Sequence, residues 1–184
     1  MTRLPDEQIV ARARQLEWLL LDVDGVLTDG RLTYGPEGER DKVFHVRDGL
    51  GLRLARRSGL KVGILSGRAS EALRVRAAEL EVDWLMMDRS DKGVVFPQFV
   101  FDHDLLPAQV AYVGYDLVDL PVLLRCGLSF APADAVREVR ERVHLVLRQT
   151  GGNGAVREVC ELLLKARGQW DELIAPYFHV GEPD

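Results

Sequence analysis

The chain has 184 residues, and we expect residues 1–184 to fold as one domain, because this length suits one well-buried core. Hydrophobic residues make up 47% of the chain and charged residues 29%, a globular composition that excludes intrinsic disorder. The formal net charge of −5 argues against a nucleic-acid partner, because binding to a polyanion depends on clustered Lys and Arg.

Short apolar runs alternate with amphipathic stretches along the chain, which is typical of a parallel sheet covered by helices on both faces. We therefore predict an α/β fold with a doubly wound, Rossmann-like parallel sheet. The predicted strands are residues 18–23, 61–65, 83–86, 110–114, 127–130 and, more briefly, 143–147. The predicted helices are residues 48–58, 70–80, 91–101, 117–125, 133–141 and 154–167.

Three features depart from this alternation. After the first strand, residues 31–34 and 42–46 flank Gly35-Pro36-Glu37-Gly38, a pattern that predicts a projecting β-hairpin, or flap, over about 31–46. Pro97 lies inside a predicted helix and predicts a kink or an early end there. We expect the tail, residues 169–184, to be mobile.

The location of the protein is also constrained by composition. No apolar run approaches the roughly 20 residues needed to cross a bilayer, and residues 1–17 are polar, so we expect no membrane partner. Cys126 and Cys160 lie in apolar stretches without metal-ligand spacing. We therefore expect free buried thiols in a soluble protein of the reducing cytoplasm.

Chemically active residues follow four of the predicted strands, and the carboxyl ends of parallel strands meet in one crevice. The first strand runs into Asp22-Val23-Asp24-Gly25. A carboxylate can attack a phosphoryl group only if a hard cation such as Mg²⁺ screens the charge. Asp22 would then form an aspartyl-phosphate, and Asp24 would serve as general acid and base. Taken alone, this segment is equally typical of a solvated turn.

The next two strand ends carry groups that suit a phosphate. Ser66 and Gly67 offer O–H and N–H donors, although Ser-Gly after a strand is more often only a turn. Lys92 lies near the start of a predicted helix, where the helix dipole opposes a cation unless an anion faces it. A phosphate and the Asp22 carboxylate would supply that anion, while a lone lysine is usually a surface residue.

The fourth strand end, after Val113, carries Asp116 and Asp119, which could complete the oxygen ligands of the cation or simply cap a helix. An Asp-x-Asp pair, a Ser, a Lys and a second acidic segment occur in that order over about a hundred residues. This order resembles the four-motif pattern of the haloacid dehalogenase superfamily. The resemblance implies catalytic roles for Asp22, Asp24 and Lys92.

A closer resemblance covers most of the chain. The stretches that carry it are Thr28 to Gly35, Gly38-Glu39, Lys42, Phe44, Val46 to Gly51, Ser66-Gly67-Arg68, Asp91-Lys92 and Gly151 to Glu158. They resemble the 3-deoxy-D-manno-octulosonate 8-phosphate phosphatases, of the capless subclass, which are similar to the phosphatase-like domain of some sialic-acid cytidylyltransferases.

This resemblance implies a Mg²⁺-dependent phosphatase for a small acidic sugar phosphate in lipopolysaccharide biosynthesis. It implies that there is no cap domain, and that neighbours in a homotetramer close the site, with the hairpin at the tetramer centre. Thr28, Ser66, Gly67, Arg68 and Arg47 are the implied phosphate- or substrate-binding residues, although Arg47 could instead form an intersubunit salt bridge. Asp22, Asp24, Asp116 and Asp119 are the implied metal ligands.

The sequence departs from the family in two places. Gly114-Tyr115-Asp116 stands where the family usually has Gly-Asp-Asp, and the resemblance implies that the replaced aspartate binds the metal directly. Met87-Asp88 stands where the family usually has Gln-Gly. Three hypotheses therefore remain: an active phosphatase for the eight-carbon substrate, a phosphatase for a nine-carbon sugar-acid phosphate, and a tetramerising domain with weakened or lost activity.

Overall fold

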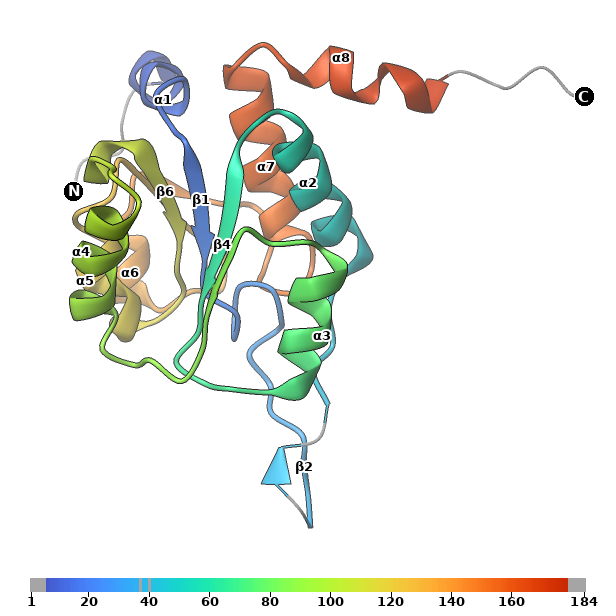
Figure 1. The fold of residues 1–184 in the computed structure, drawn as a ribbon, viewed down its shortest axis with the longest axis vertical. Coiled ribbons are helices and arrows are strands. Elements are labelled where there is room, and N and C mark those ends of the chain that lie inside the picture. The colour runs from blue at the N-terminus through green and yellow to red at the C-terminus, as the bar shows by residue number, and fades with distance from the viewer. Residues whose placement is uncertain (1–5, 37, 40, 179–184) are drawn as a thin grey trace, which may run out of the picture.

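The computed structural model of the protein describes residues 6–36, 38–39 and 41–178. Its main sheet has the strand order β5-β4-β1-β6-β7-β8, and every neighbouring pair is parallel (Figure 1). The strands are β1 Trp18–Leu21, β4 Lys61–Leu65, β5 Trp84–Met86, β6 Val110–Val113, β7 Leu128–Ala131 and β8 Leu145–Val146. The predicted doubly wound sheet is confirmed.

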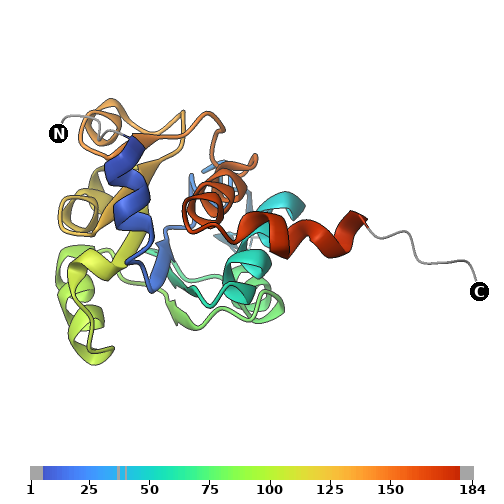
Figure 2. The same cartoon turned by 90° about the horizontal axis from the view of Figure 1, so that it is seen from above.

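Two layers of helices cover the sheet because side chains alternate along each strand. Figure 2 shows helices on both sides of the sheet. In β1, Leu19 and Leu21 belong to the hydrophobic cluster shared with α1, α2, α3 and α7, whereas Trp18 and Leu20 belong to the cluster shared with α4, α5 and α6. The helices are α1 Asp6–Ala13, α2 Val46–Arg57, α3 Glu71–Glu79, α4 Lys92–Asp102, α5 Leu120–Leu123, α6 Arg137–Arg140 and α7 Ala155–Ala166. Both faces of β1 are therefore buried.

Some helices differ from the prediction. Helix α1 was not predicted, and residues 117–125 divide into the 3₁₀ turn η2 Leu117–Asp119 and α5. Helix α4 continues past Pro97 to Asp102, so the predicted early end is wrong. Proline lacks the N–H that would bond to the Gly93 carbonyl, and Arg125 Nη1 donates to that oxygen at 3.2 Å instead. A side chain from a neighbouring segment thus stabilises the turn around Pro97.

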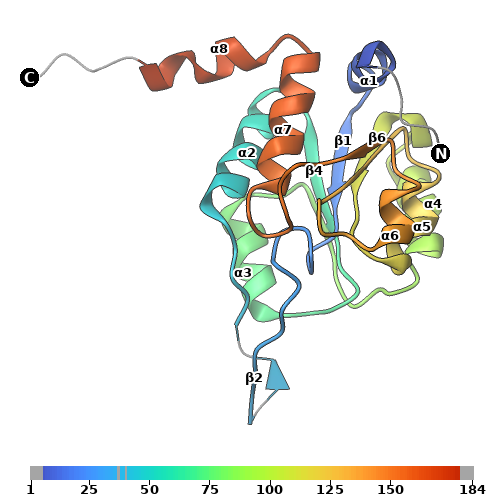
Figure 3. The same ribbon diagram turned by 180° about the vertical axis from the view of Figure 1, so that it is seen from behind.

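The hairpin is present but shorter than predicted. Strand β2 is Tyr34–Gly35 and β3 is Gly38–Glu39, paired antiparallel, while residues 42–46 form no strand. A two-stranded ribbon without a third strand gains little stability, which accounts for the short pairing. It projects beyond the carboxyl ends of the main strands (Figure 3). The turn Leu106–Gln109 precedes β6 and includes the 3₁₀ helix η1 Pro107–Gln109.

The predicted tail begins with helix α8 Trp170–Ile174 and the 3₁₀ turn η3 Ala175–Phe178, which extend from the end of the molecule opposite the hairpin (Figure 3). The rest of the tail, 179–184, lies outside the described residues. Within the described part of the chain, every helix is too short or too polar to span a membrane.

Two loops that carry the family resemblance pack together and fix the segment after β1. A Cβ added to Gly151 would lie 2.0 Å from the Gly25 carbonyl oxygen, so only glycine permits this approach. Gly152 N donates to Val26 O at 2.9 Å. On α2, the buried Asp48 side chain accepts a hydrogen bond from Arg157 N at 2.7 Å and so satisfies a backbone N–H group in the first turn of α7. These contacts hold the segment after β1 against α7.

Candidate active site

The strand ends converge on one pocket of about 270 Å³. Its lining includes six of the site residues predicted from the sequence, namely Asp22, Asp24, Gly67, Arg68, Lys92 and Asp116. Gly30, Ser90, Tyr115 and Val118 complete the lining. Parallel strands β1, β4, β5 and β6 deliver these groups to one edge of the sheet, as expected for this topology.

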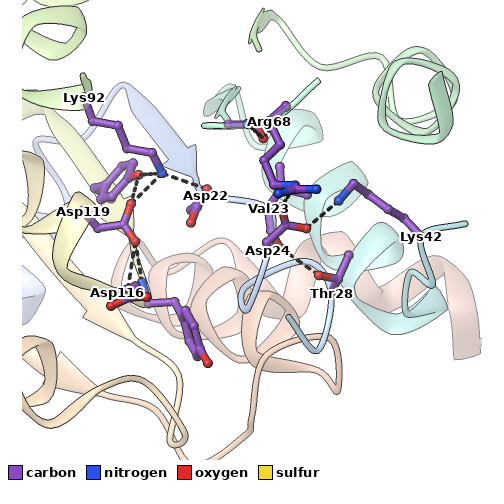
Figure 4. A network of polar contacts seen from close by, with 12 residues as sticks. Asp22, Val23, Asp24, Thr28, Lys42, Arg68, Lys92, Asp116 and Asp119 are labelled. Atoms are coloured by element: carbon purple, nitrogen blue, oxygen red, sulfur yellow. Dashed lines mark hydrogen bonds and ion pairs between the residues drawn. The ribbon is translucent and has the colours of Figure 1, made fainter. Parts of the chain in front are cut away.

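Asp22 and Lys92 meet at the bottom of this pocket. Lys92 Nζ lies 2.8 Å from Asp22 Oδ1 and 2.7 Å from Asp119 Oδ1, and all three side chains are buried (Figure 4). Burial raises the pKa of Asp22 to about 7, and the Asp119 carboxylate adds to the rise against the opposing effect of Lys92. When Asp22 is ionised, two carboxylates and one ammonium leave one negative charge in excess at this point.

The lysine remains cationic in spite of its burial. Burial alone would lower the pKa of Lys92, but the Asp22 and Asp119 carboxylates outweigh that effect and raise the pKa above its ordinary value. Tyr112, which is also buried, accepts a hydrogen bond from Lys92 Nζ at 3.1 Å. The ammonium is thus held by three oxygen atoms and points at the proposed nucleophile.

Asp119 lies beneath the pocket lining rather than in it. Its Oδ1 accepts from Tyr112 OH at 2.6 Å and from Lys92 Nζ, and its Oδ2 accepts from Tyr115 N at 2.8 Å and Asp116 N at 3.1 Å. Burial and the Asp119 charge raise the pKa of Tyr112 well above its ordinary value, so the phenol donates. These four donors occupy both carboxylate oxygens, which favours a supporting role for Asp119.

Asp24 is held by two cations on the other side of the pocket. Lys42 Nζ donates to Asp24 Oδ1 at 2.6 Å, and Arg68 Nε lies 3.8 Å from Asp24 Oδ2 (Figure 4). Arg68 also donates from Nη2 to Tyr34 OH on the hairpin at 3.0 Å. Asp24 is therefore linked to the hairpin in two ways, through Lys42 and through Arg68, which also contacts Tyr34.

The remaining predicted site residues lie outside the pocket lining. Ser66 is buried, donates from Oγ to Arg68 O at 2.7 Å, and accepts from Arg68 N, so it shapes the loop. Thr28 is also buried, and its Oγ1 accepts from Gly30 N at 3.3 Å. Arg47 lies in a separate cleft with Arg148, Gln149 and Arg157. The structure thus does not bring Arg47 together with Asp22.

Sequence reasoning missed Tyr112 and gave Lys42 no role. Tyr112 occupies an apolar strand, where a buried phenol needs a hydrogen-bond partner, and this requirement was a usable signal. Lys42 gave no such signal, because its contact with Asp24 depends on how the chain returns from the hairpin. Tyr115 was identified as a departure, and its ring lies directly against Gly25, whose added Cβ would be 2.4 Å from Tyr115 Cγ.

The donor set suits a hard divalent cation, although it is incomplete. Asp22, Asp24 and Asp116 line the pocket with carboxylate oxygens, which Mg²⁺ prefers, and the excess negative charge beside Lys92 favours a cation. Asp116 also caps the turn η2, where its Oδ1 accepts from Leu117 N at 2.7 Å. Within the described residues, however, no three His, Cys, Asp or Glu side chains already form a metal-binding cluster.

This sheet order, with an Asp-x-Asp segment after strand β1 and a buried lysine facing it, defines an α/β protein of the haloacid dehalogenase class, and the described residues contain no cap domain. No protein-family model matches the chain. It is 44% identical over 164 residues to the 3-deoxy-D-manno-octulosonate 8-phosphate phosphatase of Escherichia coli strain K12, covering 89% of this chain and 87% of the relative. The chain therefore belongs to the 3-deoxy-D-manno-octulosonate 8-phosphate phosphatase family.

Solved structures agree with this placement. The phosphatase of that name from Moraxella catarrhalis, in complex with magnesium, phosphate and a KDO molecule, has a TM-score of 0.90 at 35% identity and covers 93% of this chain and 98% of its own. The cobalt-bound deoxy-D-mannose-octulosonate 8-phosphate phosphatase from Haemophilus influenzae has a TM-score of 0.84 at 40% identity, covering 87% and 94%. Related structures thus bind divalent metal ions.

Proposed function

We propose that the protein is a Mg²⁺-dependent phosphatase that hydrolyses 3-deoxy-D-manno-octulosonate 8-phosphate to the free sugar acid and inorganic phosphate. The observation that carries the proposal is the buried contact of 2.8 Å between Lys92 Nζ and Asp22 Oδ1 in a pocket that also contains Asp24 and Arg68. A nucleophilic carboxylate, a fixed cation and a second carboxylate are the groups that phosphomonoester hydrolysis by this route requires.

In the proposed mechanism, a carboxylate oxygen of Asp22 attacks phosphorus and the ester P–O bond breaks. Asp24 gives its proton to the departing sugar oxygen, which leaves as an alcohol. Asp24 then takes a proton from water, the water oxygen attacks the aspartyl-phosphate, and phosphate leaves with Asp22 restored. Lys92 holds Asp22 in place and balances charge on the phosphoryl oxygens.

The pocket also suits the other parts of such a substrate. Mg²⁺, when bound by Asp22, Asp24 and Asp116, would screen the negative charge of the phosphate that otherwise repels an anionic nucleophile. Gly67 and Arg68 follow β4 at the pocket edge and are proposed to bind the phosphate or the sugar carboxylate, since a guanidinium matches both anions. Ser66 and Thr28 are proposed to hold these loops.

A substrate panel tests the proposal directly. We expect phosphate release from 3-deoxy-D-manno-octulosonate 8-phosphate in the presence of Mg²⁺, with little release from neutral sugar phosphates, and we expect Asp22→Asn to abolish it. Preference for a nine-carbon sugar-acid phosphate would change the substrate but keep the mechanism. If the folded protein releases no phosphate from any sugar phosphate, the proposal is wrong.

Tyr115 motivates a second candidate, an assembly domain that keeps the fold but has lost metal binding. A neutral phenol is a poor ligand for Mg²⁺, and no three-acid cluster is preformed in the described residues. Calorimetric titration with Mg²⁺ separates the candidates. Binding that is lost in Asp22→Ala favours the enzyme, and no detectable binding favours the assembly domain.

We further propose that the protein is a homotetramer with the hairpin near its centre and that it works in the cytoplasm as a single domain. The exposed Tyr34 on the projecting hairpin and the buried free thiols Cys126 and Cys160 support these proposals. Analytical ultracentrifugation tests the first, since sedimentation as a monomer at micromolar concentration would contradict it. Fractionation of cells that contain the protein tests the second.

A further inference from the structure

Lys42 is the most deeply buried group that contacts the proposed acid–base residue, and neither the motif pattern nor the proposed mechanism gives it a role. Its side chain is 2% exposed, while the Asp24 side chain is 23% exposed at the pocket edge. The two are joined by a contact of 2.6 Å between Lys42 Nζ and Asp24 Oδ1. A lysine held this far from solvent is rare without a specific electrostatic partner.

The position of Lys42 is set by the packing of the segment that returns from the hairpin. Two residues further on, Phe44 packs against the main hydrophobic cluster, and the Arg76 guanidinium of α3 lies 5.8 Å from its ring centroid. Lys42 and Phe44 line the same shallow groove along α3. The backbone that carries Lys42 is thus anchored on a helix, and the ammonium reaches Asp24 from a fixed point.

Asp24, by contrast, lies in the turn after β1 and outside any helix or strand. A carboxylate on a turn that is partly exposed would rotate among several conformations, and proton transfer requires one of them. Lys42 occupies Oδ1, whereas Oδ2 faces Arg68 at the pocket. We propose that Lys42 is a positioning residue that orients Asp24 for proton transfer to the leaving sugar oxygen, so that the return segment of the hairpin is part of the catalytic machinery.

This inference rests on the proposed phosphatase function and concerns one step of it. When Asp22 attacks phosphorus, the electron pair of the breaking P–O bond goes to the leaving oxygen, which takes its proton from Asp24. A sugar alkoxide is a poor leaving group and needs that proton, whereas p-nitrophenolate leaves readily without it. A defect in the orientation of Asp24 must therefore slow the sugar phosphate more than p-nitrophenyl phosphate.

The experiment compares Lys42→Met with wild type on both substrates. General acid catalysis contributes roughly 10²–10⁴-fold, so we expect kcat for the sugar phosphate to fall by at least about thirtyfold and kcat for p-nitrophenyl phosphate by less than about threefold. KM for both substrates should change little, because Lys42 is not proposed to contact them. Lys61→Met removes an exposed lysine at the opposite end of the sheet and is the matched control.

A double-mutant cycle protects the test against a simple folding defect. In an Asp24→Asn background, Lys42→Met should cost little further activity, because the residue it positions can no longer transfer a proton. Lys42→Arg should restore part of the lost kcat. Equal losses on both substrates, full additivity with Asp24→Asn, or unchanged kcat would each overturn the inference. Failure of wild type on both substrates would instead refute the proposed function.

Discussion

Replacing Lys92 by methionine tests the electrostatics on which the site depends. The substitution keeps the length of the side chain but removes the ammonium that contacts Asp22 Oδ1 at 2.8 Å and Asp119 Oδ1 at 2.7 Å. At an effective dielectric constant of about 20, each contact contributes roughly 6 kcal/mol before desolvation is subtracted. Burying the ammonium costs several kcal/mol, so we expect a net loss of about 3–5 kcal/mol in the free energy of unfolding.

For a chain of this length, that loss lowers Tm by roughly 6–20 °C, which differential scanning calorimetry of the metal-free protein in EDTA resolves. The pH dependence identifies the cause. The pKa of Asp22 is already raised to about 7, and it should rise further without Lys92. The folded protein then binds a proton that the unfolded chain lacks above about pH 4, so its stability rises as the pH falls.

We therefore expect the destabilisation by Lys92→Met to be about 1 kcal/mol smaller at pH 5.5 than at pH 8. Lys61→Met, which removes an exposed lysine, should change the stability by less than about 0.5 kcal/mol at either pH. A loss below about 1 kcal/mol, or a loss of the same size at both pH values, would show that packing rather than charge governs this position.

Three further substitutions test other parts of the structure. Gly151→Ala places a Cβ 2.0 Å from the Gly25 carbonyl oxygen and should lower the free energy of unfolding in urea by about 3 kcal/mol. Gly67→Ala is the control, because the nearest atom to its added Cβ lies 3.8 Å away and the stability should change little. Equal effects of the two substitutions would contradict the close contact between Gly151 and Gly25. Burial and Arg12 lower the pKa of His144, so the unfolded chain takes up a proton at this residue before the folded protein does as the pH falls. The stability advantage of wild type over His144→Gln should therefore shrink from pH 7.5 to pH 5.5. A difference that stays constant over this range would refute the reasoning. Tyr115→Asp adds a carboxylate to the pocket and should tighten Mg²⁺ binding by about tenfold in calorimetric titration; unchanged affinity would show that this position does not reach the ion.

The sheet could be predicted because its strands are buried on both faces. Such strands form continuous apolar runs, as in Trp18–Leu21, and turn residues separate them clearly from helices. Helix α1 was missed because half of its eight residues are polar, and Ile9 and Ala13 are its core residues among those whose burial is described. The continuation of α4 past Pro97 depended on Arg125, which is distant in sequence and so gave no local signal.

The pocket could be predicted only as far as main-chain topology determines it. The ends of β1, β4 and β6 must meet, so Asp22, Arg68 and Asp116 could be expected to share one pocket. The position of Arg47 at the start of α2 could not be derived in this way, because it depends on how the chain crosses from the hairpin. The contact between Lys42 and Asp24 was hidden for the same reason.

The two aspartates after β6, Asp116 and Asp119, look equivalent in the sequence, but the structure gives them different positions. Asp119 folds back beneath the strand end against Gly114, whose added Cβ would lie 2.6 Å from Asp119 Cβ, so this close approach requires glycine. There Asp119 accepts hydrogen bonds from Tyr115 N, Asp116 N and Lys92 Nζ. It thus fixes the loop after β6 and holds the Lys92 ammonium beside Asp22. Asp116, in contrast, lines the pocket. We therefore expect a tyrosine at position 115 to affect metal affinity, while Asp119 keeps Lys92 aimed at Asp22.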